Sequence, residues 1–337
     1  SGLGGGAIWL LHRARDGRDV MIDGRERAPL AATADMYLDQ RGDVIPRASI
    51  DGVLAAGIPG VPAALDHLAR YYGRLPLSMT LGPAIVLAQE GFPVDPVYQR
   101  MAGFRLSALR DSGAASKQFL LNGDVPPIGY LIKQPALAGT LMQIARSGAA
   151  GFYRGDVARR MVEAVRGAGG IWSEHDLREY RVLERQPVTV DYQQHRIVSA
   201  SLPSSGGILI AQMLKVLDLL DFDQAGGVDR IHLLIESMRL AYADRARYLG
   251  DSDYVPVPVA RLVSTAYARS QAARIDRTRA AKSATLDGVR PQGRDTTHFS
   301  IMDLEGNRVA ATLSVNYPFG SGFVAGDTGV LLNDEMD

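Results

Sequence analysis

The sequence predicts an α+β fold, because strand-like runs lie near both ends of the chain and helical patterns fill most of the stretch between them. The 337 residues comprise 37 Lys and Arg against 37 Asp and Glu, 46% apolar residues and no cysteine. This composition is typical of a globular protein, and its balanced charge argues against binding to nucleic acid or to an anionic membrane. The absence of cysteine excludes thiolate nucleophiles and cysteine-ligated metals.

A β-hairpin is expected at the start of the chain. Two apolar runs, 8–11 and 20–22, flank the turn residues Asp16 and Gly17. The residues before them, Gly2 to Ala7, formally satisfy a dinucleotide-binding fingerprint, but a strand-like run follows where that fingerprint requires a helix. We therefore expect these glycines to permit close backbone approach in a packed interior.

Helices are expected where apolar side chains recur at helical spacing. The six clearest segments are residues 62–72, 84–90, 137–147, 157–166, 207–220 and 230–249. In the last segment we expect one apolar stripe to face the core, formed by Ile231, Leu234, Ile235, Met238 and Tyr242. None of the apolar runs reaches the roughly 18 residues that a membrane span needs.

Short polar motifs mark helix starts and a loop. Ser173 and Asp176 have the spacing of a capping box, and a serine within residues 203–207 is expected to cap the helix that follows. Residues 276–295 contain almost nothing that could anchor in a core, so we expect this segment to be mobile. The six histidines lack the spacing of metal ligands, and we expect neither a metal nor a cofactor.

A second hairpin is expected near the end of the chain. Polar residues alternate with apolar ones in both of its runs, including Thr296 and His298 in the first and Ser314 and Asn316 in the second. A register that pairs 296 with 316 and 298 with 314 places both polar sets on one face. That register requires a three-residue loop, 305–307, with its second or third residue in the left-handed region.

The junction of Asp295 and Thr296 lies where the polar segment meets this hairpin. If the peptide bond between them were cut, Thr296 would carry both a hydroxyl and a free α-amine, which is a nucleophile with its own base. An ordinary α-amine has a pKa of about 7.7–8.0, which suits a general base at neutral pH. By residue type alone, however, threonine is common at a loop-to-strand junction and an arginine such as Arg25 is usually exposed.

A longer pattern identifies the family that this chain resembles. The motifs are Asp23-Gly24-Arg25-Glu26, Phe152-Tyr153-x-Gly155, Thr296-Thr297-His298-Phe299-Ser300, Asn307-x-Val309-Ala310-x-Thr312-x-Ser314-x-Asn316, Phe319-Gly320-Ser321-Gly322 and Gly329-x-Leu331-Leu332-Asn333. In this order they resemble the γ-glutamyltransferases, and the resemblance covers the whole chain. It implies an N-terminal-nucleophile hydrolase fold, an αββα sandwich of two stacked antiparallel sheets between helical layers.

The resemblance also implies how the chain is divided and what it does. Residues 1–295 would be the large-subunit portion, residues 296–337 would begin the small subunit, and both would form one αββα domain. The precursor would cut itself between Asp295 and Thr296. Thr296 would then attack γ-glutamyl amides such as glutathione and form a γ-glutamyl ester, which water, an amino acid or a peptide would resolve.

Four further residues match substrate-binding positions of the resembled family. Arg25 matches the arginine that binds the substrate α-carboxylate, and Ser314 matches a hydroxyl position next to the nucleophile's amine. Asn316 and Glu335 match positions that bind the α-amino group. Glu335 stands where some relatives have glutamine, and a carboxylate there strengthens the attraction for an ammonium group. By the same resemblance, further pocket residues would follow residue 337.

Two alternatives remain open at this point. The first keeps the fold and changes the substrate, because the resembled family includes cephalosporin acylases and a poly-γ-glutamate transpeptidase. The second is an unprocessed, non-catalytic precursor or binding protein on the same scaffold, since fold alone does not establish function. The resemblance further implies a periplasmic or secreted protein, with large and small subunits from one precursor.

Overall fold

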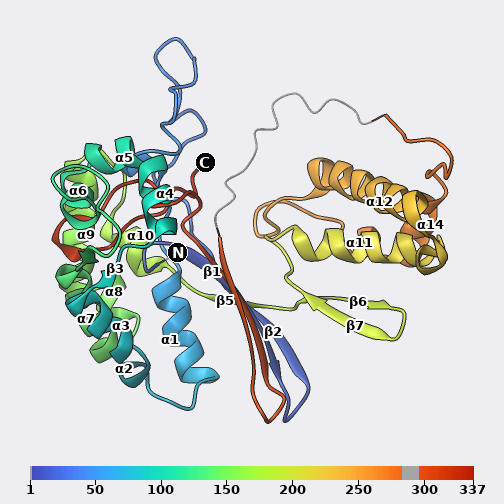
Figure 1. Cartoon of the computed structure of the whole chain (residues 1–337), viewed down its shortest axis with the longest axis horizontal. Helices are drawn as coiled ribbons and strands as arrows, with labels where there is room; N and C mark the ends of the chain where they lie inside the picture. The colour runs from blue at the N-terminus through green and yellow to red at the C-terminus, as the bar shows by residue number, and fades with distance from the viewer. Residues whose placement is uncertain (1, 283–295) are drawn as a thin grey trace.

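The computed structural model describes residues 2–282 and 296–337, and its central element is a five-stranded antiparallel sheet. In spatial order the strands are β5 (Leu183–Arg185), β2 (Arg18–Gly24), β1 (Gly6–Arg13), β9 (Arg308–Ser314) and β8 (Thr297–Met302). β9 pairs with β1 along the length of both strands, so the start and the end of the chain build one sheet (Figure 1). The expected α+β fold class and the first hairpin are confirmed.

Two small two-stranded sheets and fourteen α-helices make up most of the remaining regular structure among the described residues. One sheet pairs β3 (Phe92–Pro93) with β4 (Leu131–Ile132), and the other is a hairpin of β6 (Val188–Tyr192) and β7 (His195–Ser199). The helices are α1 (Val61–Tyr71), α2 (Leu77–Thr80), α3 (Gly82–Glu90), α4 (Pro96–Phe104), α5 (Leu106–Asp111), α6 (Gly113–Phe119), α7 (Pro135–Ser147), α8 (Ala150–Tyr153), α9 (Gly155–Gly167), α10 (Glu174–Glu179), α11 (Gly206–Asp218), α12 (Gly227–Tyr248), α13 (Val259–Leu262) and α14 (Thr265–Ala272). All six predicted helices are present, with ends that differ by a few residues.

The sheet separates two groups of helices. Figure 1 shows α1 to α10 on one side of it and α11, α12 and α14 on the other. On the first side, Trp9 and Ile22 of the sheet pack with Val61 and Ala64 of α1, and all four are buried. Because side chains alternate between the two faces of a strand, the polar residues of β8 and β9 lie on the opposite face of the sheet. This polar face borders the site described below.

The long helix α12 corrects one expectation about the core. Its predicted core stripe is solvent-exposed, with Ile231, Ile235 and Tyr242 exposed by 60%, 56% and 52%. The helix packs on α11 through a different face, which includes the buried residues Leu233 and Leu240. Apolar residues thus occupy two faces of α12, and helical spacing alone does not tell which face a neighbour covers.

Three motifs at helix and strand starts have different outcomes. The capping box at Ser173 and Asp176 is present. Ser205 stands at the N-cap of α11 but makes no capping hydrogen bond; its hydroxyl instead accepts one from Arg245 Nε at 3.2 Å. The N-terminal glycines do allow close approach, because a Cβ on Gly4 would lie 1.9 Å from the Leu331 carbonyl oxygen.

The register of the second hairpin differs from the prediction by two residues. His298 lies opposite Thr312, not Ser314, and β8 ends at Met302 opposite Arg308. The loop is therefore five residues long, and the Asp303 carboxylate stabilises it by accepting hydrogen bonds from the Asn307 backbone N–H at 2.9 Å and from its side-chain amide at 2.8 Å. Gly306 adopts the expected left-handed conformation. A shift of two keeps every side chain on its predicted face, so the polar residues still share one face.

The expected mobile segment lies mostly beyond the described residues, which exclude 283–295. Residues 276–282 are described, and the Ala281 N–H donates to the buried Glu236 carboxylate of α12 at 3.0 Å. No described helix combines the length and the apolar character that crossing a membrane requires.

Candidate active site

The five predicted site residues line one cavity of about 350 Å³. They are Thr296, Arg25, Ser314, Asn316 and Glu335. Asp295, the other half of the expected cleavage site, lies outside the described residues. Three parts of the chain that are far apart in sequence thus meet at Thr296.

The central sheet positions the hydroxyl groups of the cavity. Thr296 directly precedes β8, and Ser314 ends β9, so continuing the observed register places the two residues side by side. Gly6 of β1 lies opposite Ser314 on its other side. A Cβ on Gly6 would lie 2.1 Å from the Glu26 carboxylate, so only glycine leaves room here for that group.

Asn316 leaves the strand by a backbone conformation that favours glycine. Its φ is +69°, in the left-handed region that asparagine tolerates better than most residues. Its N–H donates to the Ser314 hydroxyl at 2.9 Å, and its side-chain amide donates to the Asp334 carbonyl at 3.1 Å. These two bonds fix Asn316 at the edge of the cavity.

Arg25 and Glu335 form an ion pair across the cavity. Arg25 Nη2 lies 2.9 Å from Glu335 Oε2, and their side chains are 41% and 18% exposed. The Tyr180 hydroxyl donates to the Arg25 carbonyl at 2.6 Å, and the Glu335 N–H donates to the Asn333 side chain at 3.0 Å. Both backbones are therefore held while both charged groups remain accessible.

Glu26 is a cavity residue that sequence reasoning did not assign, although it lies within the quoted Asp23–Glu26 motif. Its Oε1 is buried and has no hydrogen-bond partner among the described residues. Burial, together with the nearby Glu335 charge, raises the pKa of Glu26 to about 8, although Arg25 opposes the shift. The cavity therefore contains a carboxyl group that titrates near neutral pH.

His298 is held by other residues of the sheet. Its Nδ1 lies 2.8 Å from the Thr312 hydroxyl, and its Nε2 lies 3.4 Å from the Ser300 hydroxyl. Both ring nitrogens thus face partners along the strands, so this geometry favours a structural role for His298. The expected pairing of His298 with Ser314 is wrong because of the register shift.

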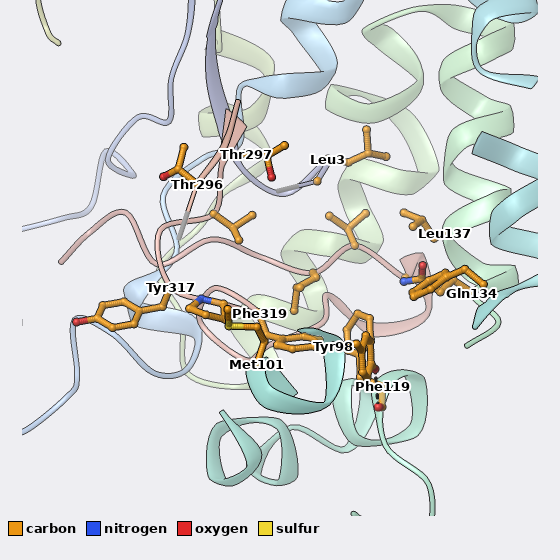
Figure 2. A pocket seen from close by; sticks show the side chains of 17 residues that line it. Leu3, Tyr98, Met101, Phe119, Gln134, Leu137, Thr296, Thr297, Tyr317 and Phe319 are labelled. Atoms are coloured by element: carbon orange, nitrogen blue, oxygen red, sulfur yellow. Dashed lines mark hydrogen bonds between the residues drawn. The ribbon is translucent and has the colours of Figure 1, made fainter. Parts of the chain in front are cut away.

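A second cavity, of about 580 Å³, meets the first at Thr296. Figure 2 shows Thr296 and Thr297 at one end and aromatic side chains, including Tyr98 and Phe119, along one wall. Sequence analysis did not predict this cavity, because its walls come from segments scattered over the whole chain. Among the described residues, no group of His, Asp and Glu has an arrangement that could hold a metal ion.

The fold and the site together define a class of protein. A threonine at the start of a strand lines a cavity that also contains an ion pair. This cavity lies at the end of an antiparallel sheet that is flanked by helices. This is the arrangement of the N-terminal-nucleophile hydrolases. A family model described as gamma-glutamyltranspeptidase matches residues 1–337, and the chain belongs to that family.

Individual relatives agree with this assignment. A glutathione hydrolase proenzyme of Pseudomonas sp. (strain A14) is 40% identical over 344 residues, which cover 99% of this chain and 59% of that protein. The chain thus spans about three-fifths of the length of the curated relatives it matches.

Two solved structures are similar in fold. A gamma-glutamyltranspeptidase from Helicobacter pylori has a TM-score of 0.81 and 37% identity, with 87% of this chain and 85% of that chain covered. A cephalosporin acylase from Bacillus halodurans has a TM-score of 0.84 and 26% identity, with 100% of this chain and 61% of that chain covered.

Proposed function

We propose that the protein hydrolyses or transfers γ-glutamyl groups from γ-glutamyl amides such as glutathione, after self-cleavage between Asp295 and Thr296. The observation that carries this proposal is the Arg25–Glu335 pair beside Thr296 in one cavity. A γ-glutamyl group ends in an α-carboxylate and an α-ammonium. The substrate carboxylate can take the place of Glu335 on Arg25, and the substrate ammonium can take the place of Arg25 on Glu335.

Cleavage comes first in the proposed sequence. The Thr296 hydroxyl attacks the carbonyl of residue 295, the amide nitrogen leaves as the α-amine of Thr296, and water hydrolyses the resulting ester. This step divides the chain into residues 1–295 and a small subunit that begins at 296. It creates the free α-amine that the later steps use as a base.

Turnover follows on the same hydroxyl. The α-amine takes the Thr296 hydroxyl proton as the oxygen attacks the γ-carbonyl, and it then gives that proton to the departing amine. The γ-glutamyl ester is resolved when water, an amino acid or a peptide attacks. In this scheme Ser314 hydrogen-bonds the α-amine, and Asn316 with Glu335 binds the substrate ammonium.

One other function is favoured by a specific observation. The cephalosporin acylase from Bacillus halodurans matches the whole described fold, so an acylase with an acyl group other than γ-glutamyl is the second candidate. A glutaryl group resembles γ-glutamyl but lacks the ammonium, and it would leave Glu335 without a partner. Turnover of γ-glutamyl amides over glutaryl amides therefore supports the first proposal, and the reverse preference supports the second.

The experiment that tests the proposal is mass spectrometry of the full-length protein, followed by a turnover assay. We expect two fragments whose boundary lies before Thr296, and release of glutamate from a γ-glutamyl amide. Thr296→Ala should give one intact chain and no turnover, whereas Thr297→Ala, as the matched neighbour, should still be cut. An intact wild-type chain after prolonged incubation contradicts the proposal and supports a non-catalytic precursor or binding protein.

The cellular setting is part of the same proposal. By the family resemblance the mature protein is periplasmic or secreted, with large and small subunits from one precursor. Fractionation of the producing cells, followed by detection of both fragments, tests this. Fragments confined to the cytosol would contradict it.

A further inference from the structure

Asp334 is a buried carboxyl group to which the proposed chemistry assigns no role. It directly precedes Glu335 in the chain and is fully buried. Its Oδ2 has no hydrogen-bond partner among the described residues. Burying a carboxyl oxygen without a partner is unfavourable, so packing alone does not explain why this residue is a carboxyl.

Asp334 binds three consecutive residues at the end of β9. Its N–H donates to the Val315 carbonyl at 3.2 Å, and its own carbonyl accepts from the Asn316 side-chain amide at 3.1 Å. Its Oδ1 accepts from the Tyr317 N–H at 3.0 Å. Of these three bonds only the last uses the side chain, so a substitution at Asp334 can remove it and leave the two backbone groups in place.

The three residues lie at the boundary of the two cavities. Val315 and Tyr317 line the second cavity, and Asn316 lines the first. The left-handed conformation of Asn316 is strained and persists only where the surrounding contacts hold it. Because the Tyr317 N–H is bound to Asp334, the residue that follows Asn316 is held in place.

Asp334 also connects the two residues that are proposed to bind the substrate ammonium. Asn316 and Glu335 lie on different segments of the chain, and both line the first cavity. Glu335 follows Asp334 directly, and its N–H donates to the side chain of the buried Asn333 at 3.0 Å. A movement of this segment relative to the end of β9 would change the separation of the two ammonium-binding groups. Two groups can bind one ligand atom together only when their separation is fixed.

We infer that Asp334 is a positioning residue for the substrate ammonium, because its bond to Tyr317 keeps Asn316 and Glu335 at the separation at which both can bind that group. This inference rests on the proposed γ-glutamyl function and adds a residue to it. The role requires a hydrogen-bond acceptor at Oδ1 and does not require a charge. Asparagine would keep this acceptor, whereas alanine would remove it.

The test measures the binding of L-glutamate and of glutarate to the mature, cleaved protein by calorimetry. The two compounds differ only in the α-ammonium, so the ratio of their Kd values reports the contacts of that group. In the wild type we expect a ratio of roughly ten or more in favour of L-glutamate, the scale of one hydrogen bond to a charged group. Asp334→Ala should bring the ratio close to one, whereas Asp334→Asn should keep it.

Turnover gives a second measurement on the same variants. The substrate ammonium makes the same contacts in the ground state and in the transition state, so Asp334→Ala should raise KM for a γ-glutamyl amide and change kcat little. Self-cleavage before Thr296 should remain, because it involves no substrate ammonium. Where Asp334→Ala does not fold, Asp334→Ser takes its place, since its hydroxyl is one bond shorter than the carboxyl oxygen.

Asp176 provides a matched control. It is also buried, and its carboxylate likewise accepts backbone hydrogen bonds, from Leu30 and Ser173 at 2.7 Å each, but it lines neither cavity. Asp176→Ala should therefore lower the free energy of unfolding and leave the ratio of Kd values as in the wild type.

The inference and the proposed function can fail separately. A ratio that Asp334→Ala keeps, or that Asp334→Asn or Asp176→Ala also abolishes, overturns the inference while the proposed function stands. Equal binding of L-glutamate and glutarate by the wild type overturns the proposed ammonium contacts, and the inference with them.

Discussion

The two cavities that meet at Thr296 are built in opposite ways. The charged cavity is closed by an ion pair between accessible groups, Arg25 and Glu335, which a zwitterion can replace. The second, aromatic cavity has a wall of packed rings, and one of them, Phe319, lies on a loop that the buried Arg105 holds through the Pro318 and Gly320 carbonyls. The difference teaches that one side of the nucleophile is suited to exchanging contacts with a ligand, whereas the other is fixed by folding.

The largest effect should come from breaking the fixed side. Arg105→Ala would remove the buried donor to the Pro318 and Gly320 carbonyls and, among the described residues, would leave Asp51 paired with Arg47 alone. Each hydrogen bond from a charged group contributes about 1.5–3 kcal/mol, so loss of the two loop bonds should cost roughly 3–6 kcal/mol. Urea unfolding measures the free energy of unfolding, and Arg100→Ala is the control because Arg100 lies exposed on α4. Equal stability of the two variants would show that the loop needs no such support.

A smaller but more selective effect should come from the exchangeable side. Arg25→Ala should lower kcat/KM for γ-glutamyl amides, because the substrate carboxylate would lose its charged partner. The expected loss corresponds to about 2–5 kcal/mol of transition-state stabilisation. Self-cleavage should remain, because it involves no substrate carboxylate. Arg27→Ala, at an exposed arginine two residues away, is the control. Unchanged kcat/KM in Arg25→Ala would remove Arg25 from the site.

The charged cavity should also respond to pH. The pKa of Glu26 is raised from 4.5 to about 8 in the folded protein, so its contribution to stability is present below about 4.5 and is lost as the pH rises through about 8. Each unit of pKa shift corresponds to about 1.4 kcal/mol. Glu26→Gln stays neutral and should flatten this decline in the free energy of unfolding, measured by urea titration between about pH 5 and 9.

Part of the decline should remain in Glu26→Gln. Burial raises the pKa of Asp334 to about 7, and this carboxyl contributes with the same sign. A pH profile in the variant identical to that of the wild type would show that Glu26 titrates normally in the folded protein.

The smallest effect is expected at His298. His298→Gln removes the bond to Thr312, and loss of one hydrogen bond costs about 0.5–1.5 kcal/mol of stability. Because the α-amine is the proposed base, turnover should change little. A loss of about a hundredfold or more in kcat, with the fold intact, would instead identify His298 as a general base.

The sequence could predict much of the fold, but its limits are physical. Alternation along the last hairpin placed Thr296 and Ser314 on one face correctly. The alternation could not fix the register, because the direction of the side chains repeats every two residues and a shift of two leaves each side chain on the same face. The decisive contact was local to the loop, where Asp303 binds Asn307, and the pattern of the strands does not contain it.

The site was predictable only where a resemblance supplied distant partners. Arg25 and Glu335 are 310 positions apart, and no spacing rule brings them together. Glu26 and the aromatic cavity escaped prediction for a related reason. A carboxylate beside an arginine is expected in solvent, and an apolar residue such as Phe319 is expected in an ordinary core. Only the three-dimensional arrangement distinguishes these residues from their common roles.

The shared sheet has a consequence for how the protein folds before the proposed cut and refolds after it. β9, which follows the proposed cut, pairs with β1, which precedes it, and the Asn333 side chain donates to the carbonyls of Gly4 and Gly57, so residues from both sides of the cut build one structure. Before the cut, folding is a reaction of one chain and does not depend on concentration. After it, the same structure can re-form only when two separate polypeptides meet, so recovery from unfolding depends on their concentration. The proposed maturation therefore makes the protein one that assembles once as a single chain and, when unfolded later, refolds poorly in dilute solution.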